Sequence, residues 1–240
     1  MDMHDEIAIV TGASRGLGLA LSHALARRGA KVAMLARDED ALARAAREVG
    51  EFGEVLAIAA DIGDPTQAPS IAARVAARFG PATLVVHNAS TLGAVPLQLL
   101  ADTDPRMFAA TMATNLIGPF ALSHAVVGSM VLRGHGTLVH ISSDAAVEPY
   151  PRWGAYAVSK AGLDHLARIW AAELDGTGVR VLAIDPGEMD TQMHADAIPD
   201  ADRGTLARPS DVAARIVALL GRSERALPVR LQAADIEVTT

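Results

Sequence analysis

A tyrosine and a lysine one helical turn apart are the residues of this sequence best suited to acid–base chemistry. The chain has only two tyrosines, and one of them, Tyr156, stands four positions before Lys160. This spacing places both side chains on one face of a helix. The pKa of a phenol is ~10 in water and must fall to near neutrality for proton exchange at neutral pH, a change worth ~4 kcal/mol. An ammonium ~4 Å away supplies about that much at an effective dielectric constant of ~20, so the pair predicts a general acid/base.

Two polar residues upstream could complete a site around this pair. Ser143 follows a predicted strand, Thr137–Ile141, where its hydroxyl could hydrogen-bond a carbonyl or alkoxide oxygen. Asn115 falls inside a predicted long helix, Asp104–Arg133. Asparagine is mildly unfavourable in a helix interior and often has a specific hydrogen-bonding task there. A solvent-facing or internally satisfied amide is the alternative for Asn115.

A glycine-rich turn joins the first predicted strand, Ile7–Val10, to the amphipathic helix Leu17–Arg28. Its spacing is Gly12-x-x-x-Gly16-x-Gly18. Glycine tolerates positive φ and lets a phosphate approach the backbone, while the N-terminus of the following helix favours an anion. Because the turn lies between a strand and a helix, it predicts a dinucleotide-binding site.

The type of dinucleotide depends on the charge after the second predicted strand, Lys31–Ala36. An acid there would accept hydrogen bonds from a free adenosine ribose, whereas a base would pair with a 2′-phosphate. Arg37 takes this position, and with Arg15 in the glycine-rich turn it offers two guanidinium groups for a phosphate. We therefore favour NADP(H) over NAD(H), with NAD(H) kept as the alternative because Asp38 is adjacent.

Short β-branched runs alternate with longer Ala-, Leu- and Arg-rich stretches along the whole chain. This alternation predicts one α/β domain over residues 1–240, in which a parallel sheet is covered by helices on both faces. The remaining predicted strands are Val55–Ala59, Leu84–His87, Arg180–Ile184 and Val229–Gln232. The remaining predicted helices are Glu39–Val49 after an Asp38 cap, a helix opened by Asp64 and Pro65 that ends at Phe79, and Gly154–Leu174.

Polar residues or glycines follow five of these strands. In an open parallel sheet, ligands bind outside the carboxyl ends of the strands, so these residues together predict a cleft along one edge. Ordinary turns could explain any one of them alone. The stretch Glu188–Leu206 is polar and acidic without a clear period, and we predict a surface loop or mobile lid there.

Composition excludes several classes of function. The 240 residues are 50% hydrophobic with a formal net charge of −7, which argues against a disordered chain and against a nucleic-acid-binding protein. The absence of cysteine removes disulfides, thiolate nucleophiles and cysteine-ligated metals, and the eight histidines have no metal-binding spacing. With neither a signal-peptide pattern nor an apolar run of ~18 residues, the sequence predicts a soluble, cytoplasmic protein without a membrane segment or metal site.

Taken together, these motifs resemble those of the short-chain dehydrogenase/reductase family over residues 6–221. The matching residues are Thr11-Gly-Ala-Ser-Arg-Gly-Leu-Gly18, Asp61, Asn88-Ala89, Asn115, Ser143, Tyr156-x-x-x-Lys160 and Pro186-Gly187. The resemblance implies a Rossmann-type doubly wound sheet and a homodimer or homotetramer. Two features depart from the family pattern: His87-Asn-Ala-Ser90 replaces the usual Asn-Asn-Ala-Gly, and the C-terminus lacks the common glycine-rich ending, which puts the last strand in doubt.

The resemblance also implies a catalytic tetrad of Asn115, Ser143, Tyr156 and Lys160. In family members the tyrosine exchanges the proton of the carbonyl oxygen, the serine orients that oxygen, the lysine lowers the tyrosine pKa and holds the nicotinamide ribose, and the asparagine positions a water. The full set of expected cofactor-binding residues is Gly12, Ser14, Arg15, Gly16, Leu17, Gly18, Arg37, Asp61, Ile62, Asn88, Ala89, Tyr156, Lys160, Pro186, Gly187, Met189 and Thr191.

The sequence thus predicts an NADP(H)-dependent oxidoreductase of the carbonyl reductase or alcohol dehydrogenase type. It would transfer a hydride between nicotinamide and a carbonyl or alcohol carbon of a small molecule, with Tyr156 as general acid/base. The alternative is a non-catalytic NADP(H)-binding redox sensor or scaffold, because fold alone does not decide function.

Overall fold

Seven strands form one parallel sheet in the computed structural model, which describes residues 3–221 and 227–237. The strands are β1 (Ile7–Thr11), β2 (Lys31–Ala36), β3 (Val55–Ala59), β4 (Leu84–His87), β5 (Gly136–Ile141), β6 (Val179–Asp185) and β7 (Arg230–Gln232). Their order is β3-β2-β1-β4-β5-β6-β7, and every neighbouring pair is parallel. This is the Rossmann-like doubly wound α/β fold, so the predicted fold class is confirmed.

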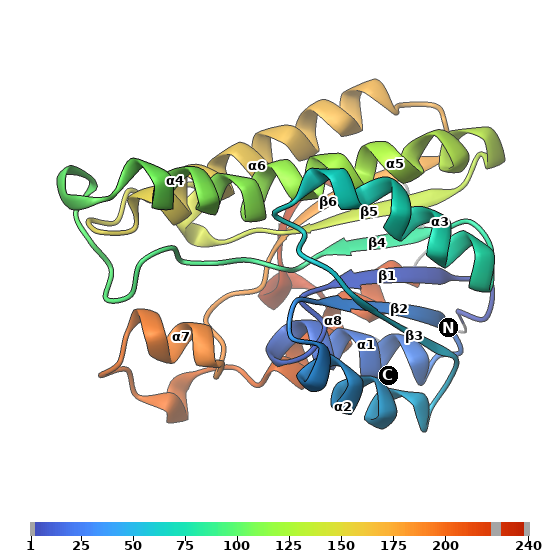
Figure 1. Ribbon diagram of the computed structural model, residues 1–240, viewed down its shortest axis with the longest axis horizontal. Coiled ribbons are helices and arrows are strands. Elements are labelled where there is room, and N and C mark those ends of the chain that lie inside the picture. Colours follow the sequence, from blue (N-terminus) through green and yellow to red (C-terminus); the bar gives the residue numbers. More distant parts are fainter. Residues whose placement is uncertain (1–2, 222–226, 238–240) are drawn as a thin grey trace.

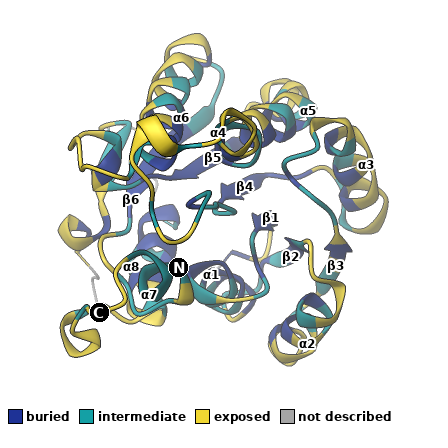
Figure 2. Ribbon diagram, turned by 60° about the vertical axis from the view of Figure 1, so that its left-hand side comes forward, coloured by how far each residue is buried: buried dark blue, intermediate teal, exposed yellow. Residues whose placement is uncertain are grey.

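Helices cover both faces of this sheet (Figure 1). They are α1 (Gly16–Ala26), α2 (Glu39–Gly50), α3 (Ala68–Phe79), α4 (Pro105–Met112), α5 (Gly118–Arg133), α6 (Gly154–Glu173), α7 (Gln192–Ala197) and α8 (Pro209–Leu220). Successive strand residues point to opposite faces, so Val10 packs with α1, α2 and α8, whereas Ile9 packs with α3, α5 and α6. The central strands are consequently buried between two helical layers whose outer faces are exposed (Figure 2), whereas the edge strands β3 and β7 are partly exposed.

Local signals set several helix boundaries as expected. The Asp38 carboxylate accepts a hydrogen bond from Ala41 N at 2.9 Å and caps α2. Asp64 caps in the same way, although the turn it opens, Pro65–Gln67, is a 3₁₀ turn that leads into α3. The predicted helix Asp104–Arg133 is divided, because a π-helical turn at Ala113–Ile117 lies between α4 and α5.

Two parts of the C-terminal third differ from the sequence prediction. The predicted loop Glu188–Leu206 contains α7 and a 3₁₀ turn at Arg203–Thr205, and Arg203 Nε donates to Asp190 Oδ1 at 2.8 Å. Helix α8 follows and was not predicted. The last strand, in doubt from the sequence, forms as β7, with Arg230 opposite Ala183 of β6.

One helical segment of the described residues meets the length and composition of a membrane span, which the sequence analysis did not identify. Within Pro105–Arg133, an 18-residue window has a mean hydropathy of 1.4 and is 39% buried. Leu122, Val126 and Met130 of this segment pack in the core beside the sheet. Since helices that cover a sheet pass the same composition test, the segment is weak support for a membrane span.

Candidate functional site

The glycine-rich turn after β1 is held against the end of β4 by hydrogen bonds. Thr11 Oγ1 accepts from the amides of Asn88 and Ala89 at 3.0 and 2.9 Å, and Asn88 Nδ2 donates to Thr11 O at 2.9 Å. Gly12 has a φ of +66°, and a Cβ there would lie 2.9 Å from Ala89 Cα. Only glycine fits this contact. The predicted residue Asn88 therefore shapes the turn through its side chain.

The N-terminus of α1, which follows this turn, offers free donors and positive charge. Arg15 occupies the N-cap without a side-chain hydrogen bond to the helix, and the first turn holds no acidic residue. Arg15 and Arg37 are both exposed, and neither guanidinium group has an ion pair or hydrogen bond to another described residue. These observations fit an anionic dinucleotide. Leu17 differs from its neighbours, because its side chain lies in the core and only its backbone could contribute.

The other predicted cofactor residues lie on neighbouring strand ends. The amide of Ala13 donates to Leu35 O at 3.0 Å, which places the glycine-rich turn beside the end of β2, just before Arg37. Asp61 follows β3, and its carboxylate accepts from Gly63 N at 2.9 Å. Ile62, the next residue, is buried.

The segment after β6 also lies close to the glycine-rich turn. A Cβ at Gly16 would lie 3.6 Å from Thr191 Cγ2. Thr191 also caps α7, since its hydroxyl accepts from His194 N at 3.2 Å. Met189 forms an isolated β-bridge with Ala207, and its side chain is partly buried against the hydrophobic core. Gly187, after Pro186, has a φ of +73° and donates to Asp185 Oδ1 at 3.1 Å.

Tyr156 and Lys160 lie on one buried face of α6. Their exposed fractions are 8% and 2%. Lys160 Nζ donates to the carbonyl oxygen of Ile141, at the end of β5, at 2.7 Å, and it lies 5.5 Å from the centroid of the Tyr156 ring. The predicted pair is therefore close together at the same sheet edge as the glycine-rich turn.

The pKa of Tyr156 shifts in the direction opposite to the one that the sequence predicts. Burial raises it from 10.0 to about 12, and the hydrogen bond with the Ser143 hydroxyl opposes this only in part. Burial lowers the pKa of Lys160 from 10.5 to about 8. The expected effect of the ammonium on the phenol is absent because the phenol is desolvated and Lys160 is directed at the Ile141 carbonyl.

The Ser143 hydroxyl lies between the phenol and a carboxylate. It donates to Asp144 Oδ1 at 2.9 Å and accepts from Ala145 N at 3.2 Å. Tyr150 donates to the other oxygen of Asp144 at 3.0 Å. To donate to a substrate oxygen, the Ser143 hydroxyl must rotate away from Asp144.

Asn115 is buried, and its side chain has no hydrogen bond to Tyr156 or Lys160. Its Oδ1 accepts from Thr91 N at 2.8 Å, and its Nδ2 donates to Thr91 O and to Ser159 Oγ, both at 2.9 Å. Ser159 in turn donates to Tyr156 O at 2.6 Å. The side chain thus links the segment after β4 to α6. This agrees with the alternative given above, an amide whose hydrogen bonds are satisfied inside the protein. Sequence reasoning missed Ser159, a small polar residue one helical turn after Tyr156.

The described residues form no metal site at this sheet edge. Within residues 3–221 and 227–237, no group of three His, Asp or Glu side chains is placed to hold a metal ion.

Comparison with known proteins gives consistent similarities. Residues 6–202 match the family model described as short chain dehydrogenase. D-threitol dehydrogenase from Mycolicibacterium smegmatis is 33% identical over 224 residues, which cover 89% of this chain and 85% of that protein. The crystal structure of a short chain dehydrogenase from Salmonella enterica serovar Typhi has a TM-score of 0.87 at 29% identity, covering 95% of both chains. A metagenomic short-chain oxidoreductase in complex with NADP has a TM-score of 0.81 at 29% identity, covering 95% of this chain and 96% of that one.

Proposed function

Because the chain belongs to the short-chain dehydrogenase family, an oxidoreductase family, we propose that it is an NADP(H)-dependent enzyme that interconverts a carbonyl and an alcohol of a small molecule. The observation that carries the proposal is the buried Tyr156 phenol beside Lys160 and Ser143, at the sheet edge that also bears the glycine-rich turn. A bound nicotinamide would supply or accept the hydride.

The residues of the chain would divide the remaining work. The N-terminus of α1, Arg15 and Arg37 would hold the phosphates. Lys160 uses one of its three donors on Ile141 O and keeps two for ribose hydroxyls. Tyr156 would hold the proton at its phenol oxygen, and Ser143 would orient the substrate oxygen.

The charge state of Tyr156 favours one direction at neutral pH. With a pKa of about 12 the phenol is protonated, so it is ready to donate to a carbonyl oxygen that becomes an alkoxide. Alcohol oxidation needs the deprotonated phenol as base. We therefore expect carbonyl reduction at neutral pH and alcohol oxidation that increases toward alkaline pH.

The preference for NADP(H) rests on Arg15 and Arg37, whose guanidinium groups have no partner among the described residues. The metagenomic relative in complex with NADP supports the same choice. The acidic residue Asp38 is occupied as the cap of α2, so it is a weaker candidate for a ribose contact.

The test is to follow NADPH absorbance with a panel of ketones, aldehydes and quinones. We expect turnover with some of them and a loss of about 10²- to 10⁴-fold in Tyr156→Phe, the usual contribution of a general acid. A Tyr156→Phe protein that folds, binds NADPH and keeps full turnover would contradict the mechanism. Tight NADPH binding without any turnover would favour the redox-sensor alternative.

We also propose that two copies associate through α5 and α6. The apolar side chains of Phe120 and Leu132 on α5 and of Ile169 on α6 are 44%, 90% and 43% exposed. The same two helices of a second copy would cover this apolar surface. Light scattering should give at least a dimer mass, and Phe120→Glu should lower it. A monomeric parent protein would contradict this association.

A further inference from the structure

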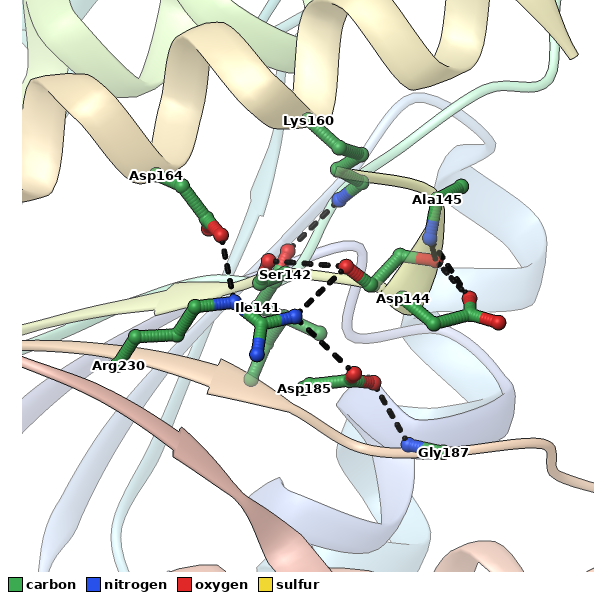
Figure 3. A network of polar contacts seen from close by, with 10 residues as sticks. Ile141, Ser142, Asp144, Ala145, Lys160, Asp164, Asp185, Gly187 and Arg230 are labelled. Atoms are coloured by element: carbon green, nitrogen blue, oxygen red, sulfur yellow. Dashed lines mark hydrogen bonds and ion pairs between the residues drawn. The ribbon is translucent and has the colours of Figure 1, made fainter. Parts of the chain in front are cut away.

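Arg230 of β7 joins three segments of the candidate site. Its Nε donates to Asp164 Oδ2 at 2.8 Å, and its Nη2 donates to Asp185 Oδ2 at 3.2 Å and to the main-chain carbonyl of Ser143 at 3.1 Å (Figure 3). Asp164 lies one turn after Lys160 on α6, and Asp185 ends β6. The guanidinium thus connects the helix of the acid–base pair, the turn of the candidate serine and the strand before Pro186.

This arrangement is largely removed from water. The side chains of Asp164 and Asp185 are each 6% exposed, and that of Arg230 is 21% exposed. Asp164 Oδ1 has no hydrogen-bond partner among the described residues. Buried carboxylates are costly without a cation, so loss of Arg230 would leave two uncompensated charges.

Those two charges lie close enough to act on the acid–base pair. Both Asp164 and Asp185 raise the pKa of Lys160, and Asp185 also raises that of Tyr156. The charged or titratable groups around Lys160 are Tyr156 and Asp164 on α6, His140 on β5, Asp185 on β6 and, paired with both carboxylates, Arg230 on β7. Arg230 is the cation that balances Asp164 and Asp185 within this group.

We propose that Arg230 is a positioning residue, which holds Ser143 in place through its carbonyl and neutralises the two carboxylates that face Lys160. The proposal rests on the proposed function, because Ser143, Tyr156 and Lys160 are taken as the reacting group. A lysine cannot replace this arginine, since the planar fork serves three acceptors in fixed directions.

The first experiment compares Arg230→Met and Arg230→Lys with Arg215→Met. Arg215 is a matched control, because its Nη1 donates to Ala234 O at 2.9 Å near β7 without contacting the site. We expect kcat for carbonyl reduction to fall about tenfold or more in both Arg230 variants, with the KM for NADPH nearly unchanged, because misplacement of a reacting group affects the chemical step. Arg215→Met should keep kcat within about twofold.

The second experiment measures Lys160 in the cofactor-free protein by NMR. The chain has only two lysines, so a ¹³C label gives two signals, and Lys31→Arg assigns them. Removing the guanidinium leaves the two carboxylates without their cation, so the pKa of Lys160 should rise above about 8 in Arg230→Met. In Arg215→Met it should keep the parent value of about 8.

A third variant is needed if Arg230→Met folds poorly. Adding Asp164→Asn removes one buried charge and should restore stability but not kcat, because the Ser143 carbonyl stays without its donor. A folded Arg230 variant with kcat within about twofold of the parent overturns the proposal. The proposed function fails separately, if Tyr156→Phe keeps full turnover.

Discussion

The ammonium of Lys160 donates to the carbonyl of Ile141 at 2.7 Å while its side chain is only 2% exposed. A buried ammonium with a single protein acceptor is poorly compensated for lost hydration. This explains why burial lowers the pKa of Lys160 to about 8. The same geometry leaves the other two N–H groups of the ammonium available to donate to a ligand.

The first prediction concerns stability at alkaline pH. The folded-state pKa of Lys160, about 8, is below the unfolded value of 10.5, so the unfolded state binds more protons between these pH values. The contribution of Lys160 to stability therefore increases from pH 8 to 10.5, by about 3 kcal/mol in total. Denaturant unfolding at several pH values should show this increase in the parent and not in Lys160→Met. Parallel curves for the two proteins would refute it.

The second prediction concerns acid. His87 and His140 stack at 4.8 Å on neighbouring strands, and both rings are buried. Burial, and then the charge of Lys160, lowers the pKa of His140 from 6.5 to about 3. Because the unfolded state takes up the proton first, the contribution of His140 to stability is lost as pH falls below 6.5, by about 2 kcal/mol at pH 5. His140→Phe should reduce this loss, and the exposed control His165→Asn should not.

Sequence patterns predicted the sheet well, because the central strands are apolar runs buried on both faces and five strand ends carry turn or polar residues. Helix α8 was missed although Pro209 at its first turn and the spacing of Val212 and Ile216 were visible. The network of Arg230 could not be predicted. Its partners Asp164 and Asp185 are 66 and 45 positions away, and only the strand order brings them together.

The pKa of Tyr156 shows a second kind of limit to sequence reasoning. Spacing placed the lysine beside the phenol, and in the structure Lys160 Nζ lies 5.5 Å from the centroid of the Tyr156 ring. The sign of the shift, however, depends on desolvation of the phenol and on which acceptor Lys160 selects. Neither is encoded in residue spacing.

The third prediction concerns Arg152, which has a φ of +74° in the turn before α6. This left-handed conformation costs roughly 1 kcal/mol or more for a residue with a Cβ and nothing for glycine. Arg152→Gly should therefore raise the free energy of unfolding by about 1 kcal/mol. Arg44→Gly, an exposed site inside α2, should instead lower it by about 1 kcal/mol. Equal effects of the two substitutions in a thermal unfolding experiment would rule out strain at Arg152.

The last prediction tests the source of cofactor preference. Arg37 is exposed after β2 without a partner among the described residues, so its guanidinium is free to pair with a 2′-phosphate. Arg37→Asp replaces attraction by repulsion and should weaken NADPH binding about 10- to 100-fold, since a charge-assisted hydrogen bond is worth ~1.5–3 kcal/mol. NADH binding should stay the same or improve, because a carboxylate can accept from the ribose hydroxyls. Fluorescence titration with both nucleotides measures this. Arg47→Asp on α2 makes the same change in net charge away from the strand end, and an equal loss of NADPH affinity there would mean that overall charge, rather than Arg37, sets the preference.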